Sequence, residues 1–481
     1  MTKPLLTTLA LAVALTASGC AMLEPQLPAA NATIPADWPL PPTTAAAKSP
    51  ATANGSTTTG TAAAEQAVAD IGWRDFFSDP KLEDLIARAL DNNRDLRVAV
   101  LNVERARSLY GIQRADRFPS VAANAGLSRT GGNVANPGDV YSAAIGVGFE
   151  LDLFGRVHNL SQAALQQYFA QEEARRSAQL ALIAEIAGTY LALAADMESQ
   201  RVAQATLDNQ QKAYDLVVKR HDLGAVSALD LAQSRTTVES ARADAARYAG
   251  LVATGTNALR LLVGAPVDAA MLPQGFDIAV SGIAPLPAQL PAQVLLRRPD
   301  VQQAEHLLRS ANANIGAARA AFFPSISLTG SVGTASNELS GLFGSGTRIW
   351  SFIPQITLPI FQGGRLRANL GVATADRDIA LARFEKSIQA GFREVADALA
   401  LTRSLADRRT AQQALLDAAS RAHDLSKVRY DQGRDSFLNL LDAQRSLYAA
   451  QQGLVSAQLA EQANRVTLYK VLGGGWMEQA K

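Results

Sequence analysis

The sequence predicts a mainly helical chain with a smaller β component, built as two tandem repeats of a strand pair and long antiparallel helices. Three observations lead to this prediction. The two halves of the chain share an internal repeat, two stretches of about 65 residues lack proline, and short segments between the helices alternate apolar with small polar residues. Each copy should therefore read helix, strand, strand, very long helix, turn, helix.

The repeat is clearest in two turn-and-helix segments, KRHDLGAVSALDLAQSR at 219–235 and VRYDQGRDSFLNLLDAQ at 428–444. They align without a gap, which places Gly224 over Gly433. A second match, RADRFPSVAANAGL (114–127) with RAAFFPSISLTGSV (319–332), extends the repeat towards the N-terminus. We expect the first copy at 73–275 and the second at 290–475.

Composition restricts the class of function. The 481 residues are 48% hydrophobic but only 6% aromatic, and the formal net charge is +1. A nucleic-acid surface would need a basic excess, so no nucleic-acid partner is expected. The one cysteine, Cys20, excludes an intrachain disulfide and a cysteine-based metal cluster. The four histidines are scattered, and no catalytic or metal constellation is found, so the chain is not expected to be an enzyme.

The N-terminus has the layout of a signal peptide at 1–19, in which Lys3 precedes a short apolar run that ends in small residues. The sequence ASGC before the expected cleavage point resembles a bacterial lipobox and marks Cys20 for lipid attachment. The alternative is ordinary cleavage beside an unused thiol. Because Ala21 and not Asp follows, the resemblance to lipoproteins of Gram-negative bacteria implies export to the outer membrane. Residues 20–72 are rich in Pro, Ala, Thr and Gly, which predicts a flexible or extended linker after the lipidated cysteine.

The longest helices are expected at 157–221 and 365–429, and each would extend roughly 100 Å. A second helix of about 37 residues follows each one, so the turns at Gly224 and Gly433 are helical-hairpin tips. The segment 178–195 is apolar enough for a membrane span, but Gln179 and Glu185 within it favour a buried coiled-coil segment.

The strands are expected at about 118–130, 140–154, 324–336 and 347–361. Strands of about ten residues with one apolar and one small polar face are typical of membrane β-barrels, whereas the alternative is a soluble sheet packed on one face. A membrane does not tolerate open sheet edges, and closed barrels need about eight strands or more. Four strands in one chain are too few, so a membrane-spanning chain must oligomerise.

These features together, with the segments WRDFFSDPKLEDLIARAL at 73–90 and GRDSFLNLLDAQRSL at 433–447, resemble the TolC-like outer membrane factors. The similarity is to their lipoprotein branch, the OprM/NodT-type channels of multidrug efflux systems. The resemblance implies a homotrimer with a 12-stranded β-barrel in the outer membrane, four strands per chain, and an α-barrel tunnel extending into the periplasm. It also implies two partners, a periplasmic adaptor (membrane fusion protein) and an inner-membrane RND-type pump.

The same resemblance implies a periplasmic gate in the second copy. Leu438 and Asp442 match positions that face the pore at its closed end, and Asp435 shares their helical face. Three Asp442 carboxylates near an axis would attract cations and raise some of their pKa values by mutual repulsion. The alternative is that Asp435 begins the helix electrostatically and that Asp442 lies on a wet face. Arg434 and Tyr430 are candidate latch residues.

Adaptor docking is expected at the tips, where small residues would let a partner hairpin approach closely. These candidate docking residues are Gly224, Ala225, Val226, Ser227, Gly433 and Ser436, together with Arg434 and Asp435. The two glycines are also explained by the backbone angles of a tight turn.

The predicted function is passive conduction of small molecules, such as drugs and toxic compounds, from the pump and adaptor to the outside. An exit channel for type I protein secretion is the alternative with the same fold. A periplasmic coiled-coil scaffold without a channel is a third reading, against which the alternating strands argue. No cofactor is expected apart from the covalent lipid on Cys20.

Overall fold

A computed structural model describes residues 23–31, 72–132, 138–276 and 292–474. The chain forms two compact units. The sheet unit takes its described residues from 1–32, 100–174 and 302–387, and the hairpin unit takes them from 33–99, 175–301 and 388–481. The units cut across the two repeats, because each repeat gives its strand pair to the sheet unit and its helical hairpin to the hairpin unit.

The order of elements is the one that the sequence predicts for two copies of one unit. In chain order the helices and strands are α3 (Trp73–Phe76), α4 (Pro80–Asn92), α5 (Arg94–Ala115), β1 (Ser120–Thr130), β2 (Gly138–Leu151), α6 (Arg156–Asp222), α7 (Ala228–Val263), α8 (Pro299–Ala320), β3 (Ser325–Ser336), β4 (Arg348–Thr357), α9 (Arg365–Asp431) and α10 (Phe437–Val471). Three short 3-10 helices complete the list: η1 (Ala269–Met271), η2 (Ala292–Arg297) and η3 (Leu339–Gly341). The two longest helices, α6 and α9, have 67 residues each, which confirms the predicted pair of very long helices.

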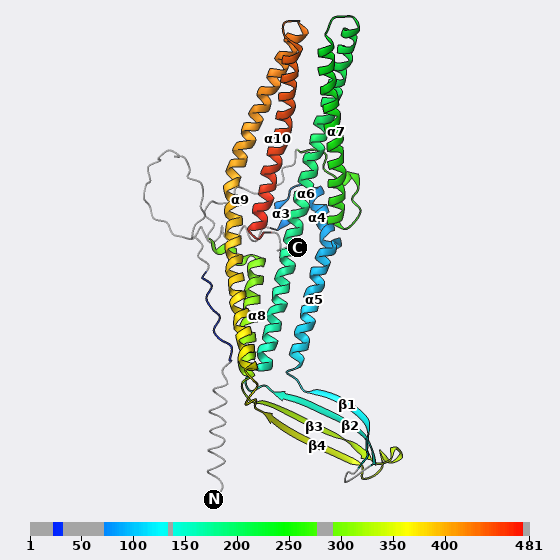
Figure 1. The fold of residues 1–481 in the computed structure, drawn as a ribbon, viewed down its shortest axis with the longest axis vertical. Helices are drawn as coiled ribbons and strands as arrows, with labels where there is room; N and C mark the ends of the chain where they lie inside the picture. Colours follow the sequence, from blue (N-terminus) through cyan, green and yellow to red (C-terminus); the bar gives the residue numbers. More distant parts are fainter. Residues whose placement is uncertain (1–22, 32–71, 133–137, 277–291, 475–481) are drawn as a thin grey trace, which may run out of the picture. The chain divides into compact units, whose positions relative to one another are not determined.

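The sheet unit is organised around one antiparallel sheet in the order β1-β2-β3-β4 (Figure 1). Its register keeps apolar residues opposite one another, as in the pairs Phe149 with Leu328 and Val332 with Trp350. The apolar face is open to solvent in the single chain, and the Trp350 side chain is 77% exposed. This pattern agrees with the expectation of strands that present one face to lipid.

The strands are somewhat shorter than predicted, for reasons visible at their ends. β1 begins just after Pro119, and β4 ends two residues before Pro359. Proline lacks the amide that a ladder hydrogen bond requires, so it stands at strand ends or on edge strands, and Pro354 lies within the edge strand β4. β2 ends at Leu151, since the next residue, Asp152, accepts a hydrogen bond at 2.6 Å from the His158 amide in the first turn of α6. A strand residue thus becomes part of a helix cap.

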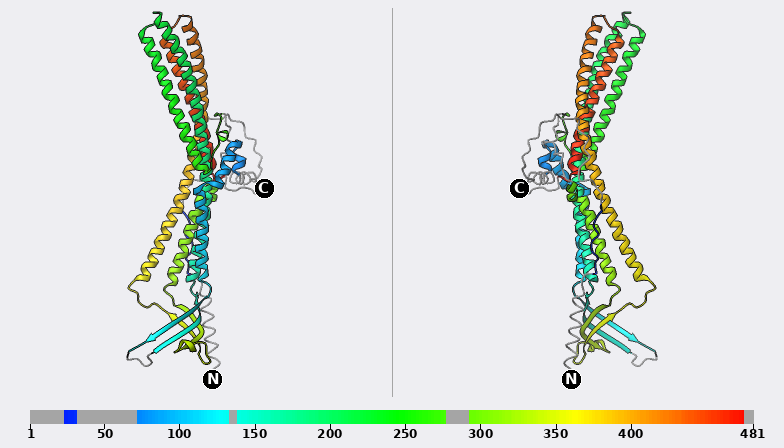
Figure 2. Two further views of the ribbon diagram at one scale, coloured as in Figure 1. Left: turned by 90° about the vertical axis from the view of Figure 1, so that its right-hand side faces the viewer. Right: turned by 90° about the vertical axis from the view of Figure 1, so that its left-hand side faces the viewer.

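The hairpin unit contains two helical hairpins, one made by α6 and α7 and the other by α9 and α10, which run side by side in Figures 1 and 2. Within the described residues, α6 is the one helix that is long and apolar enough to cross a membrane by composition. More than half of that apolar window is nevertheless buried, and Ile183, Ile186 and Tyr190 are fully buried in the main core. This confirms the prediction that 178–195 packs inside the protein.

The core of the hairpin unit also receives the short helices α3 and α4. Trp73 is fully buried, and the Phe76 ring stacks on Tyr469 of α10 with centroids 3.9 Å apart. The Tyr190 hydroxyl donates a hydrogen bond at 2.8 Å to Asp79, whose other carboxylate oxygen accepts from the Lys81 amide at the start of α4. Helices α3 and α4 are therefore packed into the core of the hairpin unit.

The N-terminal segment Leu23–Asn31 belongs to the sheet unit and lies extended on its helices. The Asn312 side-chain amide of α8 donates to Glu24 Oε1 at 3.0 Å and to the Pro25 carbonyl at 2.7 Å. Arg319 donates to the Leu23 carbonyl at 3.1 Å. This part of the expected linker is therefore extended and attached to the surface. The expected signal peptide, Cys20 and the rest of the linker to residue 71 lie outside the described residues.

Candidate functional site at the hairpin tips

The two hairpin tips have the same backbone design (Figure 1). At the first tip, Gly224 adopts φ 69°, and the Ala225 amide bonds to the Arg220 carbonyl at 2.8 Å. At the second tip, Gly433 adopts φ 70°, and the Arg434 amide bonds to the Arg429 carbonyl at 2.9 Å. This is a Schellman ending, in which a left-handed glycine satisfies the last carbonyls of the helix. Both glycines therefore have a backbone reason to be present.

A serine begins the returning helix at each tip, but the two caps differ. Ser227 and Asp230 form a reciprocal capping box at the start of α7. At the start of α10, the Ser436 hydroxyl accepts a hydrogen bond from the Asn439 backbone amide. The Ser436 backbone amide donates to the Asp435 carboxylate at 2.9 Å, and not to a side chain three residues later as in the capping box. The repeat therefore conserves the turn and changes the polar groups around it.

Tyr430 connects the two hairpins within one chain. Its hydroxyl accepts a hydrogen bond from Arg220 Nη1 at 3.3 Å, and the guanidinium lies 5.9 Å from the centroid of its ring. The Phe437 ring also contacts Tyr430, with ring centroids 5.6 Å apart. The structure therefore places the predicted latch residue Tyr430 in contact with a partner on α6 that the sequence analysis did not name.

Asp435 is held by neighbours of its own hairpin. Its carboxylate accepts a hydrogen bond from the Asn439 side chain at 2.5 Å and pairs with Arg429 at 3.2 Å. The Asn439 amide group, the Ser436 backbone amide and the Arg429 charge together hold the pKa of Asp435 below its usual value of 3.8. The carboxylate thus ties the end of α9 to the start of α10, which matches the helix-start alternative more closely than a free pore charge.

Leu438 and Asp442 are exposed in the single chain, and the Leu438 side chain is 53% exposed. An exposed leucine at this position is available to contact another surface, such as a neighbouring copy. The side chain of Arg434 is also exposed, and no ion pair joins it to another of the described residues. The single chain therefore brings Tyr430 and Asp435 into bonded networks and leaves Leu438, Asp442 and Arg434 open.

The first tip is more apolar than the second. Leu223 is 83% exposed and Leu229 is 65% exposed, and Ala225 and Val226 stand between them. The aligned positions of the second tip carry Gln432, Arg434, Asp435 and Leu438. A docking partner would therefore meet two kinds of surface on the same chain.

A second set of polar contacts joins the hairpins further along their helices. Gln210 of α6 donates to Gln444 of α10 at 2.9 Å. The Tyr448 hydroxyl of α10 bonds to Asp244 of α7 at 3.2 Å, and the Tyr248 hydroxyl of α7 bonds to Gln452 of α10 at 2.9 Å. These contacts are hydrogen bonds among uncharged groups and one carboxylate, so the hairpins are joined by bonds that can exchange partners with water.

Arg220 and Arg429 were not named from the sequence alone, although the repeat contains one signal for them. Arg220 and Arg429 occupy the same position of the repeat, immediately before the turn. Their partners, Tyr430 in one case and Asp435 in the other, could not be read from the alignment, because one contact crosses between hairpins and the other does not. Among the described residues, no group of three His, Cys, Asp or Glu side chains could hold a metal ion.

Comparison with known proteins identifies relatives over nearly the whole chain. The family model described as outer membrane efflux protein matches residues 85–265 and 290–474. The antibiotic efflux pump outer membrane protein ArpC of Pseudomonas putida is 44% identical over 487 residues, which cover 100% of this chain and 97% of that protein. The probable outer membrane lipoprotein SilC of Salmonella typhimurium is 41% identical over 413 residues, which cover 85% of this chain and 89% of that protein.

A solved structure supports the same assignment of fold. The open state of the MtrE outer membrane channel of Neisseria gonorrhoeae superposes with a TM-score of 0.82 at 40% sequence identity. The match covers 94% of this chain and 98% of that channel. The repeated strand pair and hairpin are therefore the architecture of a known class of channel.

Proposed function

The chain belongs to the outer membrane efflux protein family and is an outer-membrane channel of an efflux system, and on this premise we propose that three copies form one tunnel. The observation that carries the proposal is the sheet of four strands, in which β1 and β4 each have a neighbour on one side. With an even number of antiparallel strands, the two edges run in opposite directions. β4 of one copy can therefore pair antiparallel with β1 of the next, and three copies give a closed barrel of twelve strands.

Cysteine cross-linking tests this assembly. Pairs of single cysteines, one on β1 and one on β4, are introduced in the variant Cys20→Ala, and the chain is oxidised in native membranes. We expect covalent dimers and trimers from β1–β4 pairs. The matched control pairs a cysteine on β1 with one on the central strand β3, and it should stay monomeric. Cross-linking in the control alone would exclude the proposed edge-to-edge closure.

We place the gate at the second tip. Three copies of Leu438 would form an apolar constriction, and three copies of Asp442 would form an acidic ring beside it. The exposure of both side chains in the single chain supports this placement, because assembly would turn them towards a shared axis or a partner. The exchangeable hydrogen bonds between the hairpins would then allow the tips to separate.

Single-channel conductance in planar bilayers tests the channel and the gate together. We expect small, cation-preferring openings from the wild type and larger openings from the double variant Leu438→Ala/Asp442→Ala. Wide and equal conductance in both would keep the channel and move the gate elsewhere. Folded protein that conducts in neither form would contradict the channel itself.

Channels of this family work with an adaptor and an inner-membrane pump. We propose that the adaptor here is a periplasmic membrane fusion protein that docks on both tips, and that the pump is of the RND type. The apolar first tip and the charged second tip would give six docking positions of two alternating kinds in the trimer. The proposed cargo is small organic molecules, in agreement with the efflux names of relatives such as ArpC.

We further propose that Cys20 carries the lipid anchor. The lipoprotein name of SilC supports this assignment. Two residues lie between Cys20 and Leu23, so the Cα atoms of Cys20 and Leu23 can be about 11 Å apart at most. Leu23 is bonded to Arg319, six residues before β3 begins, so the attached segment would hold the lipid close to the strand end of the sheet unit. Metabolic labelling with palmitate should mark the wild type and not Cys20→Ala; equal labelling of both would exclude this site.

A further inference from the structure

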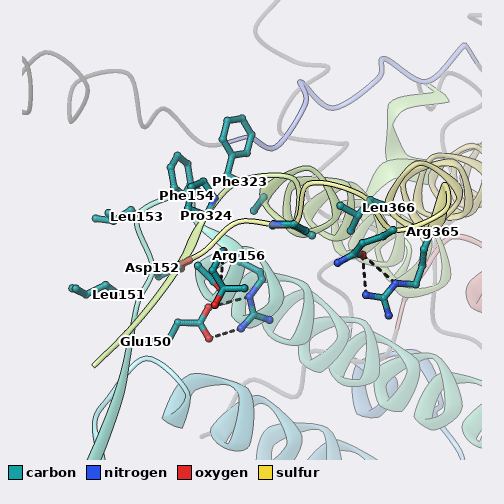
Figure 3. Close-up of a pocket in the computed structure, with 16 residues that line it drawn as sticks. Glu150, Leu151, Asp152, Leu153, Phe154, Arg156, Phe323, Pro324, Arg365 and Leu366 are labelled. Atoms are coloured by element: carbon teal, nitrogen blue, oxygen red, sulfur yellow. Dashed lines mark hydrogen bonds and ion pairs between the residues drawn. The ribbon is translucent and has the colours of Figure 1, made fainter. Parts of the chain in front are cut away.

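The sheet unit contains a recess where the strands meet the helices (Figure 3). It has a volume of about 340 Å³ and lies at the ends of β2 and β4 and the starts of β3, α6 and α9. The size is in the range of sites for small organic ligands. The recess plays no part in the tip contacts described above, which belong to the hairpin unit.

The register of the sheet places three of the strand residues that line the recess on one face, whereas the lining residue Leu151 belongs to the apolar face. Glu150 stands opposite Ser327, and Ser325 stands opposite Thr357, so all four lie on the small polar face. Glu150, Ser325 and Thr357 line the recess. In the proposed barrel this face lines the lumen, whereas lipid meets the apolar face that carries Trp350. A solute inside the tunnel would therefore reach the polar side of the recess, where Glu150, Ser325 and Thr357 lie.

One part of the recess is aromatic and apolar. The rings of Phe154 and Phe323 are stacked, with centroids 4.8 Å apart and an interplanar angle of 17°. Phe323 is 41% exposed, so part of this surface remains open to a ligand. Leu366 and Pro359 extend the apolar lining. Such a surface favours the flat or alicyclic body of an organic molecule.

The charged lining residues do not have equivalent partners. Arg156 forms a two-point pair with Glu150, with nitrogen–oxygen distances of 2.6 and 3.1 Å. The Asp152 carboxylate is bonded to an amide at the N-terminus of α6, where the helix dipole stabilises a negative charge. Arg365, at the start of α9, instead donates twice to Oε1 of the neutral Gln362 side chain, at 2.8 and 3.2 Å. Of the two arginines, Arg156 is paired with a carboxylate, whereas the described contacts of Arg365 include no opposite charge.

From this arrangement we propose that the recess binds amphipathic organic acids in transit through the tunnel. The carboxylate or sulfonate of such a molecule would take both donors of Arg365 in place of Gln362, because a guanidinium matches a planar anion better than a neutral amide. Its apolar body would lie against Phe154 and Phe323. This inference rests on the proposed tunnel and adds a preferred class of solute to it.

A matched pair of fluorescent probes tests the charge requirement. The anionic probe is 8-anilinonaphthalene-1-sulfonate, and the neutral probe is N-phenyl-1-naphthylamine, which has the same rings without the sulfonate. Both are titrated into the full-length protein in nanodiscs of zwitterionic lipid. We expect Arg365→Gln to weaken saturable binding of the sulfonate by about fivefold or more and to leave the neutral probe unchanged. Phe323→Leu should weaken both probes.

Two further variants keep the test decisive. Gln362→Glu places a carboxylate beside Arg365 and should reproduce the loss without altering the arginine. Arg348→Gln removes one positive charge at the other end of β4 and should change neither probe. Equal losses from Arg365→Gln and Arg348→Gln, or sulfonate binding that is identical in the wild type and Arg365→Gln, would overturn the proposal.

Conductance of the same preparations separates the two levels of inference. Protein that conducts but has no Arg365-dependent sulfonate binding would overturn the recess alone. Protein that does not conduct would overturn the tunnel on which the recess depends, whatever the probes report.

Discussion

Arg220 donates a hydrogen bond to the Tyr430 hydroxyl at 3.3 Å and so joins the last turn of α6 to the last turn of α9. Arg429, which aligns with Arg220 in the repeat, pairs with Asp435 of its own hairpin at 3.2 Å. One arginine therefore links the two hairpins, and its counterpart closes one of them. The same position of the repeat therefore makes a contact between hairpins in one copy and a contact within a hairpin in the other, at the tips where we place the gate.

The substitution Tyr430→Phe should favour the open tip. It keeps the aromatic contact with Phe437 and removes the acceptor for Arg220. A single hydrogen bond contributes about 0.5–1.5 kcal/mol, which corresponds to a rise of about two- to thirteenfold in the ratio of open to closed channels. Single-channel recording measures this ratio from the time that each channel spends open and closed. Tyr214→Phe, which removes a hydroxyl that has no bonded partner in the described part of the chain, is the control and should behave as the wild type. An unchanged open fraction in Tyr430→Phe would remove the latch role.

Leu438 and the aligned Leu229 offer a matched test of which hairpin lines the constriction. Both are exposed leucines two positions after a serine cap. If the constriction belongs to the second tip, Leu438→Ala raises the unitary conductance and Leu229→Ala leaves it at the wild-type value. The opposite pattern in planar bilayers would assign the constriction to the first tip.

The second tip should loosen in acid. The pKa of Asp435 is lowered by Asn439, Ser436 and Arg429, so its stabilising contribution is fully present above the usual value of 3.8. That contribution is lost as the pH falls through the lowered folded-state value. A nitroxide at Gln432→Cys in the Cys20→Ala background should therefore become more mobile between pH 5 and pH 3. With Asp435→Asn the label should be equally mobile at both pH values, and a label at the aligned Leu223→Cys serves as the control for the first tip.

Gly264→Ala should destabilise the hairpin unit. Gly264 ends α7 at φ 68°, and a methyl group there would lie 2.6 Å from the Asn92 carbonyl oxygen of α4. The strain and the displacement of backbone together should cost about 1–3 kcal/mol. Gly250→Ala, in the open middle of the same helix, has no neighbour within 4 Å and should be neutral or stabilising. Thermal midpoints at one fixed scan rate compare the two; a higher midpoint for Gly264→Ala would contradict the packing argument.

Much of the fold was predictable because its signals are local and long. The absence of proline over 157–221 and 365–429, together with the glycine and serine of each turn, predicts α6, α9 and the two tips within two residues. Alternation over 141–153 predicts the faces of β2. The ends of the strands were predicted less accurately, since they depend on whether single residues such as Asp152 form hydrogen bonds with the neighbouring helix.

The tip contacts were less predictable because they join residues that are distant in sequence. Tyr430 was named from the resemblance, but the contact with Arg220 spans 210 positions and needs the two hairpins to be packed together. The pairing of Asp435 with Asn439 is local, yet the sequence alone did not decide between a helix-start role and a pore role. The roles of Leu438 and Asp442 depend on neighbouring copies, so they stay predictions.

The opposed directions of β1 and β4 have a consequence for mixed populations of this protein. If β1 of each copy pairs with β4 of the next copy, the contacts are head-to-tail. Every copy is then needed for two of the contacts that close the barrel. One copy with a mutated edge strand would then prevent closure of a barrel that contains two wild-type copies. In cells that make sound and damaged chains in equal amounts, about one trimer in eight would be intact, so edge mutations should be dominant over the wild-type gene.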